Sequence, residues 1–190
     1  MMHVITGGSG SGKSAYAESW LTKKNLHSVD TKTNLSINAH SYLYIATMQP
    51  FGEETKKKIE RHRRMRAGKG FQTLECYGDL RMLATSIQKL KGNGILLECV
   101  SNLLADVLYQ EDGSLTEDEK VMEIVVEGIR YLNGQTGRLA IVTNEVQSDL
   151  QDYSTETRKY MELLGRINQE LGKMADQVTE VVYGIPVKIK

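Results

Sequence analysis

Eight residues near the start of the chain have the types and spacing to hold a phosphate group. The segment GGSGSGKS fits the pattern GxxxxGK[ST] and lies between a strand-like run and a helix-like run. Glycines let such a loop turn its backbone N–H groups inward around an anion. The lysine can reach the β and γ phosphates of a nucleotide, and the serine hydroxyl can bind Mg²⁺. The predicted loop residues are Gly7, Gly8, Ser9, Gly10, Ser11, Gly12, Lys13 and Ser14. A glycine-rich turn without a ligand is the alternative.

A nucleotide loop of this kind needs a second acidic group that holds or orients Mg²⁺, normally at the end of a buried strand. Glu98 directly follows the apolar residues Ile95, Leu96 and Leu97. We therefore expect Ser14 and Glu98 to form the metal site. The alternative is a carboxylate that caps the following helix near Ser101.

A basic segment around His62 could carry group-transfer chemistry. Its cations are Lys56, Lys57, Lys58, Arg61, Arg63, Arg64, Arg66 and Lys69. On a helix, Ile59, His62, Arg63 and Arg66 share one side, so the apolar Ile59 can turn His62 toward the sheet. Neighbouring cations lower the pKa of the imidazole, whose neutral ring can attack phosphorus while arginines hold phosphate oxygens. The alternative is an ordinary histidine on a solvated helix face.

Strand-like and helix-like segments alternate along the chain. Strands are predicted at 2–6, 42–46, 71–74, 94–97, 139–143, 178–183 and 186–189, and helices at 14–24, 53–67, 80–90, 101–109, 117–132 and 156–175. This alternation favours right-handed βαβ crossovers and a mostly parallel sheet. We predict an α/β, P-loop NTPase-like three-layer fold with a C-terminal hairpin at the sheet edge. Residues 1–190 are expected to form a single domain.

The composition excludes some classes of protein. The 190 residues carry no formal net charge, which disfavours a dedicated nucleic-acid binder. No apolar run is long enough for a membrane span, and no signal peptide is recognisable, so we expect a cytoplasmic protein. Cys76 and Cys99 lack metal-ligand spacing and are expected to be reduced core residues. The polar segment Asn25–Ser41, with His27 and His40, is predicted to be a long surface loop.

The chain resembles a known enzyme family through six blocks of sequence. They are VITGGSGSGKSAYAE, YIATMQPFGEETKKKIERHRRMR, TLEC, ILLECVSNLLAD, IVTNEV and LLGRINQELGKMADQVTEVVYGIPVKIK. Together they look like the bifunctional adenosylcobinamide kinase/adenosylcobinamide-phosphate guanylyltransferase family of cobalamin biosynthesis. The blocks occur in family order across nearly the whole chain, and the closing block is the most specific of them.

The resemblance implies two reactions. In the first, ATP or GTP phosphorylates the hydroxyl of the aminopropanol arm of adenosylcobinamide. In the second, a histidine attacks the α-phosphate of GTP, releases pyrophosphate and passes GMP to the phosphorylated corrinoid, giving adenosylcobinamide-GDP. The family motif places this guanylylated histidine at His62. The resemblance also implies a homotrimer with active sites between subunits.

Nucleotide contacts carry over from the family by position. Besides the glycine loop they are Ala46, Thr47, Met48, Arg63, Arg64, Met65, Arg66, Glu75 and Glu98. Glu75 follows a predicted strand, where its carboxylate could receive hydrogen bonds from guanine or ribose, or be a surface strand end. Asn144 and Glu145 close the fifth strand on the same edge and could bind the corrinoid or orient a loop.

The chain departs from the family pattern in three places, and two alternative functions remain. The Asn25–Ser41 loop is longer than usual in the family. Gly10 stands where many members carry arginine, and Ala67 where proline is frequent. A simpler P-loop small-molecule kinase, in which His62 is structural, is the main alternative. A surface that binds RNA or a protein partner under nucleotide control is another, against which the neutral overall charge argues.

Overall fold

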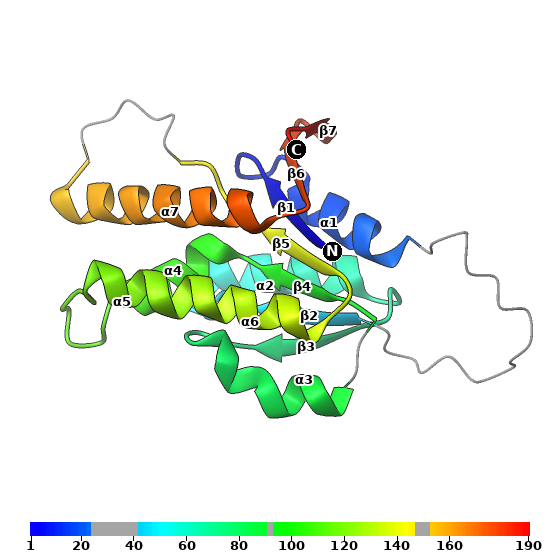
Figure 1. Ribbon diagram of the computed structural model, residues 1–190, viewed down its shortest axis with the longest axis horizontal. Helices are drawn as coiled ribbons and strands as arrows, with labels where there is room; N and C mark the ends of the chain where they lie inside the picture. Colours follow the sequence, from blue (N-terminus) through cyan, green and yellow to red (C-terminus); the bar gives the residue numbers. More distant parts are fainter. Residues whose placement is uncertain (24–41, 91–92, 147–152) are drawn as a thin grey trace, which may run out of the picture.

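The computed structural model describes residues 1–23, 42–90, 93–146 and 153–190 (Figure 1). Within these ranges the strands form one sheet in the order β3-β2-β4-β5-β1-β6-β7. The strands are β1 (Met2–Thr6), β2 (Tyr42–Ala46), β3 (Phe71–Glu75), β4 (Ile95–Glu98), β5 (Leu139–Val142), β6 (Gln177–Val182) and β7 (Ile185–Lys188). Neighbouring strands pair in parallel, except that β7 runs antiparallel to β6.

Parallel pairing brings the carboxyl ends of six strands, β1 to β6, to one edge of the sheet. Ala46 of β2 stands beside Glu75 of β3 on one side and Glu98 of β4 on the other. Glu98 in turn stands beside Val142 of β5, which pairs with Ile5 of β1. The segments that follow these strands therefore meet at this edge, where open parallel sheets bind their ligands.

Helices cover both faces of the sheet (Figure 1). The helices are α1 (Lys13–Thr22), α2 (Gly52–Arg66), α3 (Ala84–Leu90), α4 (Val100–Leu108), α5 (Asp118–Met122), α6 (Gly128–Gln135) and α7 (Thr155–Met174). Strand residues alternate between two apolar cores. Val4 belongs to the larger core with α4, α6 and α7, whereas Ile5 belongs to a smaller core with α1. The predicted three-layer α/β architecture, with its C-terminal antiparallel hairpin, is confirmed.

The element boundaries differ from the sequence pattern by a few residues. The segment predicted as one helix over 80–90 begins with a 3₁₀ turn, Leu80–Leu83, before α3. The helix predicted over 117–132 continues to Gln135 and contains a π-helical turn, Glu123–Glu127, between α5 and α6. The predicted loop Asn25–Ser41 lies outside the described residues.

Two composition-based expectations can be compared with the structure. Cys76 and Cys99 are both free and buried, as expected for reduced core residues. None of the helices in the described part of the chain combines the length and apolar character that crossing a bilayer requires.

A buried histidine joins β1 to the helix that follows the glycine loop. The ring of His3 is 1% exposed, its Nε2 lies 2.8 Å from Thr179 Oγ1, and it meets Tyr16 and Trp20 edge-on. Burial lowers the pKa of His3 to about 4. In the folded protein the His3 imidazole therefore stays neutral in mild acid. In the unfolded chain the same imidazole takes up a proton near pH 6.5.

We predict that this histidine makes the protein less stable in mild acid. Between pH 7 and pH 4 the unfolded chain binds the proton that folded His3 does not, so the free energy of unfolding falls as pH falls, by up to about 3 kcal/mol. Urea unfolding of the wild type and His3→Phe at pH 7 and pH 5 measures this term. The variant should lose less stability on acidification, and identical losses would contradict the assignment. Other titrating groups are present in both proteins and cancel in the comparison.

Candidate active site

The loop between β1 and α1 is shaped by its glycines and by the C-terminal hairpin. Gly7 has a φ of +142°, and a Cβ there would lie 2.4 Å from the main-chain oxygen of Val181 in β6. Gly12 precedes α1 in the left-handed region, with a φ of 93°. The N–H of Gly184, in the hairpin turn, donates to the carbonyl of Ser11 over 2.8 Å. The loop thus lies at the N-terminus of α1, where main-chain N–H groups and the helix dipole attract anions.

Lys13 is folded back over this loop. The residue is buried, and its Nζ donates to the carbonyl oxygen of Gly8 over 2.8 Å. Burial lowers the pKa of the ammonium group, and the neighbouring Cys99 and Glu98 oppose that shift. Phosphate oxygens entering the loop would receive charge-assisted hydrogen bonds from this ammonium group.

Ser14 and Glu98 meet at the end of β4. The Ser14 hydroxyl donates to Glu98 Oε1, while the buried Oε2 has no hydrogen-bond partner in the described structure. Burial raises the pKa of Glu98 to about 7, against the opposing effects of the Ser14 hydrogen bond, Lys13 and Arg66. Glu98 does not cap the next helix: Cys99 occupies the N-cap position, without a side-chain hydrogen bond.

A hydroxyl beside a carboxylate with one free oxygen suits Mg²⁺, which prefers oxygen ligands and binds with few protein groups when phosphates and water complete its shell. Among the described residues no cluster of three or more histidine, cysteine, aspartate or glutamate side chains could hold a metal ion. The oxygen donors of Ser14 and Glu98 fit a Mg²⁺ ion whose other ligands are phosphate oxygens and water.

His62 of α2 faces the same carboxylate. Its Nδ1 is buried, has no hydrogen-bond partner in the described structure and lies 3.9 Å from Glu98 Oε1. Burial is the main cause that lowers the pKa of His62, followed by the charges of Arg66, Arg61 and Lys13. The sequence predicted a lowered pKa for His62, which agrees with this result. Desolvation lowers the pKa more than the neighbouring cations on which the prediction was based.

The short distance between His62 and Glu98 does not make them a salt bridge. Glu98, with a pKa near 7, is itself protonated under the acidic conditions in which the imidazole takes up a proton. The carboxyl group is then neutral and offers the imidazolium little stabilisation. At neutral pH the site therefore contains a neutral imidazole, the form that can act as a nucleophile.

Two cavities meet at His62 and Glu98. The first, which we call the strand-end cavity, has a volume of about 250 Å³ and is bounded by Ala46, Ile59 and Glu75, among others. The second, the loop cavity, has a volume of about 400 Å³ and is bounded by residues 9–15 of the glycine loop. Both are lined by Met48, His62, Glu98 and Asn102. The imidazole can therefore be reached from either side.

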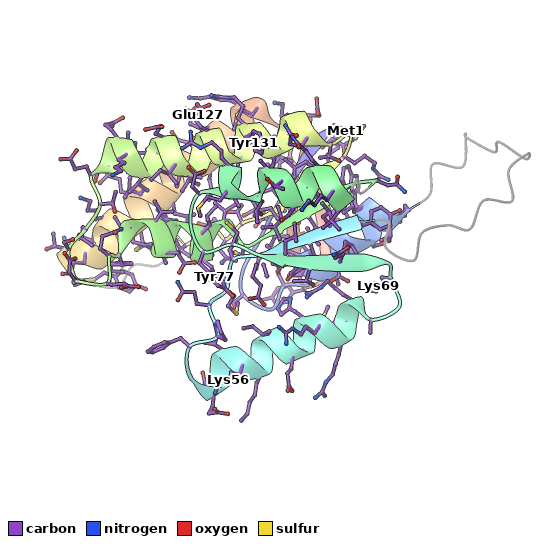
Figure 2. All side chains as sticks on the ribbon, turned by 90° about the horizontal axis from the view of Figure 1, so that it is seen from below. Met1, Lys56, Lys69, Tyr77, Glu127 and Tyr131 are labelled. Carbon is purple, nitrogen blue, oxygen red and sulfur yellow. The ribbon has the colours of Figure 1, made fainter. Side chains whose placement is uncertain are left out.

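The strand-end cavity is mostly apolar and has a polar end. Glu75 receives hydrogen bonds from Tyr77, whose hydroxyl lies 3.0 Å from Oε2, and from Arg63, whose Nη2 lies 3.4 Å from Oε1. Figure 2 shows Tyr77 on the side of the sheet that faces α2, whose N-terminal part carries Lys56. A flat, partly apolar ligand with donor groups at one edge would fit such a cavity.

Arg66 forms a wall of this cavity. Its guanidinium lies 3.3 Å from the centre of the Tyr44 ring, and its Nη2 donates to Thr73 Oγ1 over 3.5 Å. The residue is 7% exposed, and its Nη1 has no partner among the described residues. A buried guanidinium with an unused donor is well suited to an anionic oxygen.

Four predicted contact residues line neither cavity: Gly7 and Gly8 at the start of the loop, and Thr47 and Arg64. Thr47 is buried, and its hydroxyl donates to the carbonyl oxygen of Cys99 and accepts from the Cys99 N–H, each over 2.7 Å. It thereby ties the chain after β2 to the chain after β4. Arg64 lies on the outer side of α2 and pairs with Glu60 at 3.2 Å. The side chains of Thr47 and Arg64 are therefore engaged outside the two cavities.

The remaining predicted residues converge. Ser9, Gly10, Ser11, Gly12, Lys13, Ser14 and Met65 line the loop cavity, Ala46, Arg63, Arg66 and Glu75 line the strand-end cavity, and Met48, His62 and Glu98 line both. Gly7 lets the loop lie close to Val181 of β6, and the carbonyl oxygen of Gly8 accepts the hydrogen bond from Lys13. Sequence reasoning missed Tyr44, Tyr77 and Asn102 as lining residues. The position of Asn102 in the first turn of the helix that follows Glu98 was the available signal.

Comparison with known proteins identifies the family. A family model described as cobinamide kinase / cobinamide phosphate guanyltransferase matches residues 3–189. The chain belongs to this family. The CobU protein of Salmonella typhimurium, a bifunctional adenosylcobalamin biosynthesis protein, is 30% identical over the full length of both chains. The corresponding Escherichia coli protein is 31% identical over both full lengths, and the CobP protein of Pseudomonas aeruginosa is 27% identical over 100% of this chain and 98% of its own.

Family membership confirms the resemblance drawn from the sequence blocks. The protein is a cobinamide kinase and cobinamide-phosphate guanylyltransferase, a bifunctional enzyme of cobalamin biosynthesis that uses nucleotide substrates. The alternative of a monofunctional small-molecule kinase does not agree with this family. Among solved structures, a KaiC-like protein from Pyrococcus horikoshii OT3 aligns with a TM-score of 0.49 and 14% identity, covering 94% of this chain and 69% of its own.

We predict that Gly7→Ala weakens nucleotide binding whereas Gly8→Ala does not. A Cβ at position 7 would clash with the Val181 carbonyl oxygen, and the alanine would have to keep a positive φ that is unfavourable for it. A Cβ at position 8 meets no atom within 4 Å. Strain of roughly 1–3 kcal/mol would distort the loop in the first variant only. Calorimetric titration with GTP and Mg²⁺ should show at least a roughly tenfold weaker affinity for Gly7→Ala. Equal affinities of the two variants would refute this role of Gly7.

Proposed function

We propose that both reactions take place where the two cavities meet, and that His62 is the residue that becomes guanylylated. The observation that carries the proposal is that His62 lines both cavities, beside the glycine loop on one side and the ends of β2 and β3 on the other. A nucleotide that keeps its terminal phosphates in the loop and its base in the strand-end cavity would pass its α-phosphate by this imidazole.

In guanylyl transfer, a neutral ring nitrogen of His62 attacks the α-phosphorus of GTP. A nitrogen–phosphorus bond forms, the bond to the β-phosphate oxygen breaks, and pyrophosphate leaves with that electron pair. Because Nδ1 is buried toward Glu98, we assign the attack to Nε2. Arg66 and Lys13 stabilise the negative charge on the phosphate oxygens. An oxygen of cobinamide phosphate then attacks the same phosphorus and releases the imidazole.

In the kinase reaction, the glycine loop and Lys13 hold the β and γ phosphates of ATP or GTP. The cobinamide hydroxyl attacks the γ-phosphorus, and the nucleoside diphosphate leaves. Ser14 and Glu98 would hold Mg²⁺, which neutralises phosphate charge when bound. The unpaired Glu98 Oε2 supports this assignment.

The strand-end cavity would receive the guanine base in the second reaction. The carboxylate of Glu75 can accept from the ring N–H and the exocyclic amino group of guanine, both of which adenine lacks in that arrangement. Tyr77 and Arg63 hold the carboxylate in place. Selectivity for GTP over ATP in guanylyl transfer would follow from this pairing.

We further propose a single domain over residues 1–190, a homotrimer and a cytoplasmic location. The matched range 3–189 and the sheet that runs from β1 to β7 support one domain. Exposed apolar side chains on the hairpin, Tyr183, Ile185 and Ile189, support association with further copies. Two free cysteines suit a reducing compartment. Nucleic acid is not among the proposed partners.

Incubation with α-labelled GTP tests the covalent step. The wild type should gain an acid-labile, base-stable label in about stoichiometric amount, and His62→Ala should gain none. Because His62 has no role in phosphoryl transfer, His62→Ala should keep kinase activity. A labelled His62→Ala protein, or an unlabelled wild type with full guanylyl transfer to cobinamide phosphate, would disprove the intermediate.

The metal assignment is tested by a pair of matched substitutions. Glu98→Gln removes the charge at the end of β4 and should raise the Mg²⁺ concentration for half-maximal kinase activity by at least about tenfold. Glu75→Gln makes the same change at the end of β3 and should instead raise the KM for GTP in guanylyl transfer. Kinase rates measured across a Mg²⁺ titration distinguish the two. An unchanged Mg²⁺ requirement in Glu98→Gln would remove Glu98 from the metal site.

A further inference from the structure

One wall of the loop cavity has no role in the reactions as assigned so far. It consists of Cys99 and Asn102, which follow β4, and Asn144, which follows β5, all at the carboxyl edge of the sheet. β5 pairs with β1, which leads into the glycine loop, and with β4, which ends at Glu98. Asn144 therefore follows the strand between the phosphate-binding loop and the metal-binding carboxylate.

The side-chain amide of Asn144 is held in a fixed orientation. Its Nδ2 donates to Ser101 Oγ over 2.6 Å and lies 3.5 Å from Cys99 Sγ. Its main-chain oxygen accepts from Asn168 Nδ2 over 3.1 Å, and Asn168 Oδ1 accepts from the Thr143 hydroxyl over 2.8 Å. The amide nitrogen of Asn144 is thus bonded to α4, and its main-chain oxygen is bonded to α7.

The amide oxygen of Asn144, Oδ1, has no hydrogen-bond donor among the described residues, and the residue is only partly buried where it lines the loop cavity. A fixed amide oxygen on a residue that lines the same cavity as the glycine loop cannot bind a phosphate oxygen, because both are hydrogen-bond acceptors. It can bind a donor that comes to the phosphate, such as an alcohol.

We propose that this wall is the acceptor subsite and that Asn144 Oδ1 accepts a hydrogen bond from the alcohol that is phosphorylated. The proposal rests on the proposed function, because it takes the loop cavity as the place of phosphoryl transfer. The cavity, at about 400 Å³, must also contain the nucleotide phosphates. Only the end of the hydroxyl-bearing arm can therefore enter, and the corrinoid ring stays outside.

The hydrogen bond turns a lone pair of the alcohol oxygen toward the γ-phosphorus, much as side-chain amides orient attacking water in nucleotide hydrolases. The new oxygen–phosphorus bond forms as the bond to the β-phosphate oxygen breaks, and the nucleoside diphosphate leaves with the electron pair. Asn144 takes no proton. The alcohol proton passes to an oxygen of the transferred phosphoryl group.

This role separates the two activities, because formation of the guanylylated enzyme needs no acceptor. Asn144→Ala should lower kcat/KM for cobinamide in the kinase reaction by about 10- to 100-fold. The rate at which the same variant labels itself with α-labelled GTP should stay within about twofold of the wild type. A general disturbance of the site would slow both reactions.

Two further variants of the full-length enzyme test whether the amide oxygen of Asn144 is the group responsible. Ser101→Ala removes the partner of Nδ2 but leaves the amide oxygen, so kcat/KM for cobinamide should fall less than in Asn144→Ala. Asn144→Asp keeps an oxygen acceptor of the same shape, so its KM for cobinamide should lie closer to the wild-type value than that of Asn144→Ala. Thermal unfolding of each variant monitors folding.

Several outcomes would overturn the acceptor subsite: parallel loss of both reactions in Asn144→Ala, equal losses in Ser101→Ala and Asn144→Ala, or an unchanged kinase reaction. Failure of the wild type to label itself would instead count against the covalent step of the proposed function. In that case the kinase arm of the experiment still tests Asn144, because cobinamide phosphorylation is measured separately.

Discussion

The parallel register of five strands is the constraint on which the site depends. Residues from β1, β5, β4, β2 and β3 stand side by side at one edge, although they are far apart in the chain. The strands provide a rigid base: Glu98 and Glu75 are the last residues of β4 and β3, and the glycine loop and Asn144 follow β1 and β5. A shift of one residue in any of these pairings would turn the terminal side chains to the opposite face of the sheet.

The site is locally short of negative charge, within a chain that is neutral overall. Lys13 and Arg66 are both buried beside Glu98, whose carboxyl group is itself shifted toward the neutral form. On the far side of Ser14, the fully buried Glu18 of α1 accepts a hydrogen bond from Lys69 over 2.6 Å. Without a nucleotide the site thus holds buried cations that lack full compensation, a state that favours entry of a polyanion.

The sequence predicted most of the fold and the local part of the site, for identifiable reasons. The glycine loop and the strand end at Glu98 are short-range patterns, so their geometry follows from a few consecutive residues. The position of Ile59 indicated that His62 turns toward the sheet, but its assignment as the guanylylated residue required the family resemblance. Thr47 and Arg64 were assigned by position alone, and their side chains point elsewhere because that direction depends on neighbouring elements. The partnership of Asn144 with Ser101 depends on α4 and β5 meeting in space, which no local pattern encodes.

The contact between the hairpin and the glycine loop has a consequence for folding. Gly7 lies against Val181, and Ser11 accepts a hydrogen bond from Gly184, so the loop is shaped by residues far away in the sequence. Contacts of such high sequence separation require closure of a long chain segment, which costs conformational entropy. The loop therefore acquires its final geometry only after β6 has paired with β1, however favourable its own glycines are.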